Sequence, residues 1–324
     1  MLHVFLTIDT EAWPFASNWR ESGLAQEIAQ DIYGVTPEGE FGLRFQLDLL
    51  NKYRLKAVFF VETLFPYVVG LDSLDGIVKI IQDYGHEIQL HIHTEWLEKM
   101  IPSILPAKTG QNIRDFTFGE QALLIERGIQ NLRACGIKNP CAFRAGNLGA
   151  NFDTLRALHQ NGILFDTSYS ISYLDSSCGI QTPEMLLQPK KIHGVYEFPI
   201  SFFRDYPNHY RHTQLGACSF QELERVLIGA WKRGWYSFVL LSHSHELVKR
   251  RSQFGNPASA DWIVIKRFER LCHFLDCNRD KFVTTTFSEI VPEEIPDVAP
   301  SHALFSSFRH TAMRMVEQLV RRTF

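Results

Sequence analysis

The chain has 324 residues, of which 45% are hydrophobic and 21% are charged, and its formal net charge is −3. This composition excludes a disordered or fibrous protein, and the small negative charge without a long basic run argues against a nucleic-acid partner. The length suits a single α/β barrel with a large buried core.

The first residues predict neither a secretory signal nor a membrane span. Met1–Ile8 has the pattern of a short strand that leads into acidic residues, whereas a signal has a basic segment followed by an apolar one. No uninterrupted apolar run approaches the roughly 20 residues that a spanning helix needs. We therefore expect a cytoplasmic protein whose six cysteines are reduced thiols.

Strands and helices are predicted to alternate along the chain. The opening strand runs from Val4 into Asp9 and Glu11, and the polar segment Pro14–Glu40 is expected to be a loop over the strand ends. Apolar spacing then predicts helices over 41–53, 74–84 (closed by Gly85), 119–134, 153–160, 220–233 and 262–275, and strands over 56–61, 86–91, 141–144, 163–165, 195–200, 237–241 and 282–285. Such alternation predicts parallel β-α units that close into a barrel, with a doubly wound open sheet as the alternative.

The pattern changes beyond Pro292. We expect a barrel domain over residues 1–292, and a linker with a C-terminal amphipathic helix over 293–324. Within Leu304–Arg322, apolar residues recur at helical spacing and arginines outnumber acidic residues. A basic amphipathic helix can lie on an anionic membrane surface, or it can pack on its own domain or form a homo-oligomer with a second subunit. The pattern alone favours packing.

Ionisable side chains follow five of the predicted strands. They are Asp9 and Glu11, then His91, His93 and Glu95, then Arg144, then Asp166, and finally His243, His245 and Glu246. Singly, each has an ordinary explanation, such as a helix cap or a hydrogen-bonded core histidine. In a barrel, however, the carboxyl ends of the strands meet at one mouth, where enzymes carry out their chemistry. We therefore expect these groups to converge.

The groups near the third strand have the chemistry of a metal site. Imidazole and carboxylate ligands suit zinc or a related first-row divalent ion. The candidate ligands are Glu11, His91 and one of His93 or Glu95. If the strand persists, His91 and His93 share a face; if a helical turn begins, His91 and Glu95 do. Spacing leaves both alternatives open.

Five segments resemble the motifs of one known family. They are Leu-Thr-Ile-Asp-Thr-Glu, Gly-His-Glu-Ile-Gln-Leu-His, Phe-Arg-Ala-Gly-Asn, Phe-Asp-Thr-Ser-Tyr and Leu-Leu-Ser-His-Ser, in this order. The series resembles the polysaccharide deacetylase (NodB-homology) family over nearly all of residues 3–290, and in particular the branch associated with lipopolysaccharide and exopolysaccharide assembly. The resemblance implies an α/β fold, a distorted seven-stranded (β/α) barrel, that removes N- or O-linked acetyl groups from glycans. It also implies a divalent metal, with zinc favoured over cobalt, nickel or iron.

The resemblance also implies catalytic roles. Asp9 matches the general base, Arg144 the arginine that orients this base, and His243 the general acid. Asp166 lies in the motif that follows Arg144, and His245 ranks behind His243 as the acid.

The metal ligands depart from the family pattern. His91 matches the first metal-binding histidine, and Glu11 would replace the metal-binding aspartate because Thr10 occupies the usual position. Glu95 stands where the family has its second histidine, with His93 close by.

Three functions remain open from the sequence. The first is a metal-dependent deacetylase that acts on an acetylated sugar precursor, cytoplasmic or associated with the membrane. The second is a hydrolase of a non-glycan amide on the same barrel. The third is a catalytically inactive glycan-binding protein, which Thr10 and Glu95 suggest and which the retention of Asp9, Arg144 and His243 argues against.

Overall fold

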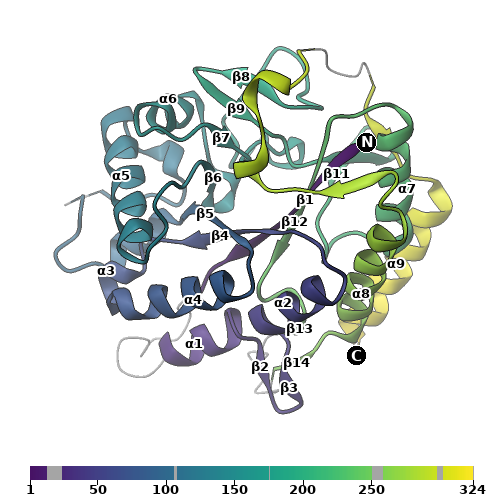
Figure 1. Ribbon diagram of the computed structural model, residues 1–324, viewed down its shortest axis with the longest axis horizontal. Coiled ribbons are helices and arrows are strands. Elements are labelled where there is room, and N and C mark those ends of the chain that lie inside the picture. Colours follow the sequence, from purple (N-terminus) through teal and green to yellow (C-terminus); the bar gives the residue numbers. More distant parts are fainter. Residues whose placement is uncertain (13–23, 106–107, 175, 250–257, 298–301, 324) are drawn as a thin grey trace.

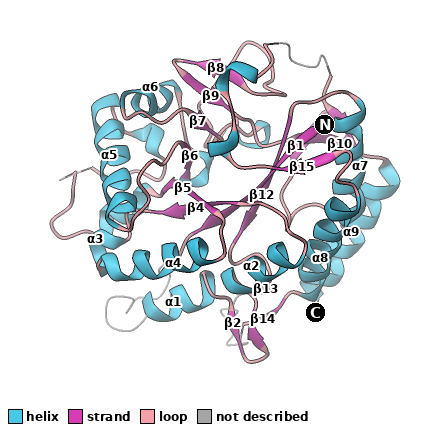
Figure 2. Ribbon diagram, in the orientation of Figure 1, coloured by secondary structure: helices cyan, strands magenta, loops and turns pink. Residues whose placement is uncertain are grey.

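A curled, mostly parallel β-sheet lies at the centre of the molecule, with helices around its outside (Figure 1; Figure 2). The computed structural model describes residues 1–12, 24–105, 108–174, 176–249, 258–297 and 302–323. Trp13 and residues 14–23 of the predicted loop lie outside these ranges. The predicted α/β fold with a distorted barrel is confirmed.

The main sheet has nine strands rather than the seven expected. Their order is β12 (Ser237–His243), β1 (Leu2–Thr10), β4 (Val58–Glu62), β5 (Glu87–Ile92), β6 (Ala142–Ala145), β7 (Phe165–Asp166), β9 (Val195–Glu197) and β8 (Lys190–Ile192), and β15 (Phe282–Thr284) also pairs with β1. All of these pairs are parallel except β8 with β9. Between the two ends of the sheet, loop residues Ser201 and Thr213 hydrogen-bond to Val239 of β12. Loop contacts therefore complete the distorted barrel.

Helices lie between successive strands at most of the predicted positions. They are α1 (Leu24–Asp31), α2 (Leu43–Lys52), α3 (Pro66–Val69), α4 (Leu71–Asp83), α5 (Phe118–Ala134), α6 (Phe152–Gln160), α7 (Phe220–Lys232), α8 (Trp262–Cys277) and α9 (Phe308–Thr323). Sequence signals explain their ends: Thr117 and Glu120 form a capping box at the start of α5, and Gly85 adopts a φ of +77° after α4.

Three small sheets were not predicted. They are β2 (Val35–Thr36) with β3 (Gly39–Glu40), β10 (Phe202–Tyr206) with β11 (His209–His212) and β16 (Leu304–Phe305), and β13 (Val248–Lys249) with β14 (Ser259–Ala260). The prediction of a single loop over 14–40 was wrong, because α1 and the β2–β3 hairpin fall within it. Leu304 and Phe305 pair with β10, so α9 begins at Phe308 rather than at Leu304.

Two apolar layers hold the barrel, and β1 contributes to both. Val4, Leu6 and Ile8 pack in the layer between the sheet and the helices, whereas Phe5 packs in the barrel interior. Because side chains alternate along a strand, Asp9 shares the interior face with Phe5. The pleat of β1 thus places the Asp9 carboxylate at the mouth of the barrel, above the aromatic side chains of its interior.

The C-terminal helix α9 packs on the barrel through polar contacts and lies outside α7 and α8 (Figure 1). Arg314 is buried and pairs with Asp205 of β10 and Glu222 of α7, at 2.9 and 3.1 Å. Arg267 of α8 pairs with Glu317 at 2.9 Å. None of the described helices combines the length and the apolar character that crossing a membrane requires. The domain boundary near residue 292 remains a prediction.

Candidate active site

A pocket of about 210 Å³ opens at the carboxyl ends of the parallel strands. Its lining contains half of the groups that the sequence singled out, together with residues from β11 and from the loops after β6, β7 and β11: Asp9, Glu11, His91, His93, Asn147, Tyr173, His212, Gln214 and His243. The predicted convergence of strand ends is therefore observed for β1, β5 and β12.

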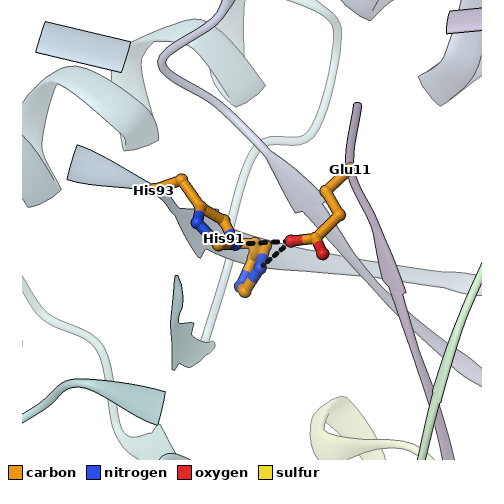
Figure 3. Close-up of side chains that lie close together, drawn as sticks. All are labelled: Glu11, His91 and His93. Atoms are coloured by element: carbon orange, nitrogen blue, oxygen red, sulfur yellow. Dashed lines mark hydrogen bonds and ion pairs between the residues drawn. The ribbon is translucent and has the colours of Figure 1, made fainter. Parts of the chain in front are cut away.

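Glu11, His91 and His93 point toward one another (Figure 3). Oε2 of Glu11 lies 3.0 Å from Nε2 of His91 and 2.5 Å from Nε2 of His93. One ligand atom from each of the three residues lies within 4.8 Å of the other two. Nδ1 of His91 hydrogen-bonds to the carbonyl oxygen of Arg144 at 2.8 Å. If Nδ1 carries the proton, as this contact requires, the lone pair of Nε2 faces Glu11.

Glu95 lies behind His93 rather than beside the ion site. Its Oε2 is 3.2 Å from Nδ1 of His93, and its Oε1 accepts a hydrogen bond from Asn147 at 2.6 Å. A carboxylate on the far nitrogen of a histidine is the usual arrangement behind a metal-binding imidazole. Of the two alternatives that spacing left open, the geometry favours His93 as the ligand and Glu95 as the residue that orients it.

The backbone explains why His93 joins His91. Strand β5 extends to Ile92, and His93 itself has extended backbone angles, so the two histidines lie on one face. Gly146 permits this position, because a Cβ at residue 146 would lie 2.7 Å from the ring of His93.

The charges of this cluster require a positive group among them. Burial disfavours ionisation of Glu11, but His93 and His91 outweigh it and hold the pKa of Glu11 well below its usual range. Burial likewise disfavours a charged His93, yet the Glu11 and Glu95 carboxylates raise the pKa of His93 well above its usual value. A proton on His93 or a bound cation satisfies the same electrostatic need. Two imidazole nitrogens and a carboxylate form a donor set that fits a zinc-like ion.

Asp9 is held by Arg144. Nη1 of Arg144 donates to Oδ1 of Asp9 at 2.6 Å, and Nη2 donates to Oγ1 of Thr7 at 2.8 Å. The guanidinium is fully buried and lies over the ring of Phe60, with 4.5 Å from Cζ to the ring centroid. This bracing fixes the orientation of the Asp9 carboxylate.

His243 faces Asp9 across the pocket. Its Nε2 lies 3.9 Å from Oδ2 of Asp9, and its Nδ1 lies 3.3 Å from Oε1 of Glu246. Burial disfavours the imidazolium, but the hydrogen bond to Glu246 and the charges of Glu246, Asp9 and Glu11 outweigh it and raise the pKa of His243 to about 9. The ring can therefore present a proton at neutral pH.

Two predicted catalytic residues lie away from this pocket. Asp166 is buried beneath it, where Oδ1 accepts a hydrogen bond from Oγ of Ser168 at 2.7 Å. The ring of His245 is tilted by 36° to that of His243, with ring centroids 5.0 Å apart, and His245 lines a neighbouring cleft. In place of His245, the carboxylate of Glu246 contacts His243 directly.

Sequence reasoning missed two supporting residues. Glu62 of β4 accepts hydrogen bonds from the backbone N–H of His93 at 2.5 Å and of Leu64 at 2.6 Å, and burial raises its pKa to about 7. Gln214 hydrogen-bonds to Glu246. Glu62 could have been found from the sequence, because it directly follows a predicted strand. Gln214 could not, because it follows the β10–β11 hairpin, which was not predicted.

A wider cleft of about 1080 Å³ adjoins the pocket and shares Glu11, His93 and Asn147 with it. The basic residues Lys249 and Arg321 also line this cleft. The candidate ion site thus lies in a continuous depression that is larger than a single acetyl group needs.

No model of a known protein family matches the sequence, and no curated protein matches it. Among solved structures, a Mycobacterium smegmatis protein assigned as a polysaccharide deacetylase has a TM-score of 0.57 at 16% identity, over 93% of this chain and 95% of that chain. A 4-alpha-glucanotransferase from Thermococcus litoralis has a TM-score of 0.53 at 10% identity, over 99% of this chain and 46% of that one. A family 4 carbohydrate esterase from Streptomyces lividans, solved with acetate, has a TM-score of 0.45 at 12% identity, over 92% and 98%.

The predicted resemblance to polysaccharide deacetylases is confirmed at the level of the fold. The glucanotransferase shares the same architecture, so the fold alone does not fix the reaction. The assignment of a reaction depends on the side chains at the barrel mouth.

Proposed function

We propose that the protein is a metal-dependent hydrolase that removes an acetyl group, N- or O-linked, from a glycan or sugar precursor. The observation that carries this proposal is that one pocket is lined by Glu11 with two histidines, by Asp9, which Arg144 holds, and by His243, which Glu246 contacts. An ion site, a braced carboxylate and a charged imidazole together are the requirements of acetyl hydrolysis at neutral pH.

Glu11, His91 and His93 would hold the divalent ion, which we propose to be zinc, with cobalt, nickel or iron as substitutes. When bound, such an ion lowers the pKa of water toward neutrality and polarises a carbonyl group. Glu95 holds the His93 ring from behind, and the carbonyl of Arg144 does the same for His91. These second contacts orient both nitrogens toward Glu11.

Asp9 is proposed as the general base that takes a proton from the attacking water. Its Oδ1 is held by Arg144, and its Oδ2 is the oxygen that faces His243 across the pocket. His243 is proposed as the general acid that donates its Nε2 proton to the leaving amine or alkoxide. Glu246 contacts Nδ1 of His243 and thereby maintains the charged ring.

An acetylated glycan is the proposed substrate, by analogy with the fold of the M. smegmatis protein and because the adjoining cleft can accommodate sugar units. Asp166 is proposed to support the site from beneath the pocket without contacting the substrate. His245 is proposed to line the adjoining cleft. The cytoplasmic location and a place in lipopolysaccharide or exopolysaccharide assembly remain predictions.

The ion site can be tested by metal analysis of the purified protein. Glu11→Ala and His91→Ala should each abolish stoichiometric metal binding, because each removes one of three ligands. His245→Ala is the matched control, since this histidine is outside the proposed ligand set, and it should retain the ion. Unchanged metal content in both ligand variants would remove the proposed site.

The base can be tested separately from the ion. Asp9→Asn keeps the shape of the side chain but removes its basicity, so acetate release from acetylated sugars should fall by roughly 100-fold or more while metal stays bound. Release of acetate from simple amides but not from sugars would favour a non-glycan amidase. Metal-bound wild-type protein that binds glycans without releasing acetate would be a catalytically inactive binding protein.

A further inference from the structure

Helix α9 is oriented opposite to an ordinary surface helix. Amphipathic helices normally turn their apolar stripe to the core and their charged face to water. In α9, Thr311, Arg314 and Gln318 face the barrel, whereas Phe308 and Val316 are 81% and 62% exposed. At 100° per residue, Phe308 and Val316 lie about 120° and about 160° around the helix from Arg314.

The inward polar face is fully engaged with the barrel. Arg314 makes two buried ion pairs, and Oγ1 of Thr311 donates to the carbonyl of Asp205 at 3.2 Å. Gln318 donates to the carbonyl of Ala217 at 3.3 Å, and Arg321 donates to that of Gly216 at 3.0 Å. Turning the apolar face inward would break these contacts and leave the buried Glu222 without its ion pair. The outward position of the apolar face is therefore fixed by the barrel.

The exposed face is an apolar strip along one side of a helix of 16 residues. Besides Phe308 and Val316, it includes Met313, Met315 and Val320, all exposed. Contiguous exposed apolar surface on a soluble fold marks a site of interaction with another apolar phase or partner.

Cationic groups lie on and beside this strip. Arg309 is exposed one residue after Phe308. A groove of about 360 Å³ lies between α7 and the start of α9. Three basic residues line it, Arg225, Lys232 and Arg233, whereas Glu224 is the one carboxylate among the described residues of its lining. Exposed Phe305 projects at this groove, with Arg225 and Arg233 over its ring at 5.1 and 5.7 Å.

We propose that the outer face of α9 and this basic groove dock on an anionic membrane surface. Apolar side chains would enter the interface between lipid headgroups and acyl chains, while the arginines and the lysine meet lipid phosphates. A second copy of the chain fits less well, because it would present the same arginine-bearing face to this basic surface and no phosphates.

Vesicle flotation tests this proposal. The full chain should float with vesicles of phosphatidylcholine that contain roughly 30% phosphatidylglycerol, and far less with phosphatidylcholine alone. Binding should weaken as salt rises, since the phosphate contacts are exposed. Phe308→Ser combined with Val316→Ser should weaken binding to the anionic vesicles at least about tenfold. Arg225→Glu combined with Arg309→Glu should weaken it to a similar degree.

Ile101→Ser is the matched control, because Ile101 is equally exposed but lies far from α9 in sequence. It should bind vesicles like the unmodified chain, and thermal melting should show that every variant is folded. The proposal fails if the Phe308 and Val316 variant floats as the unmodified chain does. It also fails if the unmodified chain binds none of the vesicles. In that case, a dimer found by light scattering that the Phe308 and Val316 variant converts to a monomer would identify a second copy as the partner.

Discussion

Gly146 shows how a single hydrogen atom in place of a side chain shapes the ion site. A Cβ at this position would lie 2.7 Å from Cγ and Nδ1 of the His93 ring, so Gly146→Ala must displace the ring or the loop. Displacement would move Nε2 of His93 away from Glu11 and break the contact with Glu95. We expect zinc affinity, measured by calorimetry, to fall roughly 10- to 100-fold.

Gly119→Ala is the control for this substitution, because a Cβ there meets no heavy atom within 4 Å. Its zinc affinity should equal that of the unmodified chain. Equal affinity of the Gly146 variant would show that His93 does not bind the ion in this position.

At the scale of the element, α9 depends on Arg314 for its attachment. This side chain is buried and pairs with Asp205 and Glu222. In Arg314→Ala, Asp205 would keep its ion pair with Arg211, whereas the buried Glu222 would lose its ion pair. Breaking a buried pair in this way costs about 3–5 kcal/mol of unfolding free energy. Urea unfolding should show this loss, whereas Arg309→Ala on the exposed side should stay within about 0.5 kcal/mol. Similar losses in both variants would contradict the polar attachment of α9.

At the scale of the whole molecule, a buried acid pair between β7 and β9 links stability to pH. Glu197 and Asp166 are register partners on these strands. Burial raises the pKa of both, and the negative charge of Asp166 raises that of Glu197 well above its usual range. Glu197 thus holds its proton to a higher pH in the folded state than in the unfolded chain. Stability therefore falls as pH rises from about 4.5, the unfolded value, toward the folded pKa.

Glu197→Gln should remove this dependence, since an amide can donate to Asp166 without ionising. The loss in the unmodified chain is at most about 1.4 kcal/mol per pH unit. Melting temperatures between about pH 5 and about pH 8 should therefore diverge, with the variant more stable at the higher pH. Glu184→Gln, at an exposed acid, should follow the unmodified chain. If the melting temperature of Glu197→Gln changed with pH in the same way as that of the unmodified chain, the raised pKa of Glu197 would be contradicted.

Much of the barrel and its mouth was predictable because the relevant patterns are local. Apolar runs and helix caps identify the β-α units, and parallel strands bring their ends together wherever they lie in the sequence. This placed Asp9, His91 and His243 in one region. The choice between His93 and Glu95 was not predictable, because it depends on whether the backbone stays extended beyond Ile92.

The orientation of α9 could not be predicted from the sequence either. Its amphipathic pattern is that of a helix that buries its apolar stripe, and the pattern predicts the helix itself correctly. Which face turns inward is decided by Asp205 and Glu222, which lie about 90 or more residues earlier in the chain. Gln214 was missed for a related reason, since it follows a hairpin whose strands, FFRDY and HYRH, have neither an apolar run nor a regular alternation.

The contacts of α9 also connect the outside of the molecule to the proposed general acid. Arg321 holds the carbonyl of Gly216, and the N–H of Gly216 donates to Oε2 of Glu246, the partner of His243. A loosened α9 would disturb Glu246 before it disturbed the ion site. Its effect on turnover should therefore grow with the basicity of the departing group: severe for an amine, which needs a proton to leave, and mild for an acidic phenol, which departs without one.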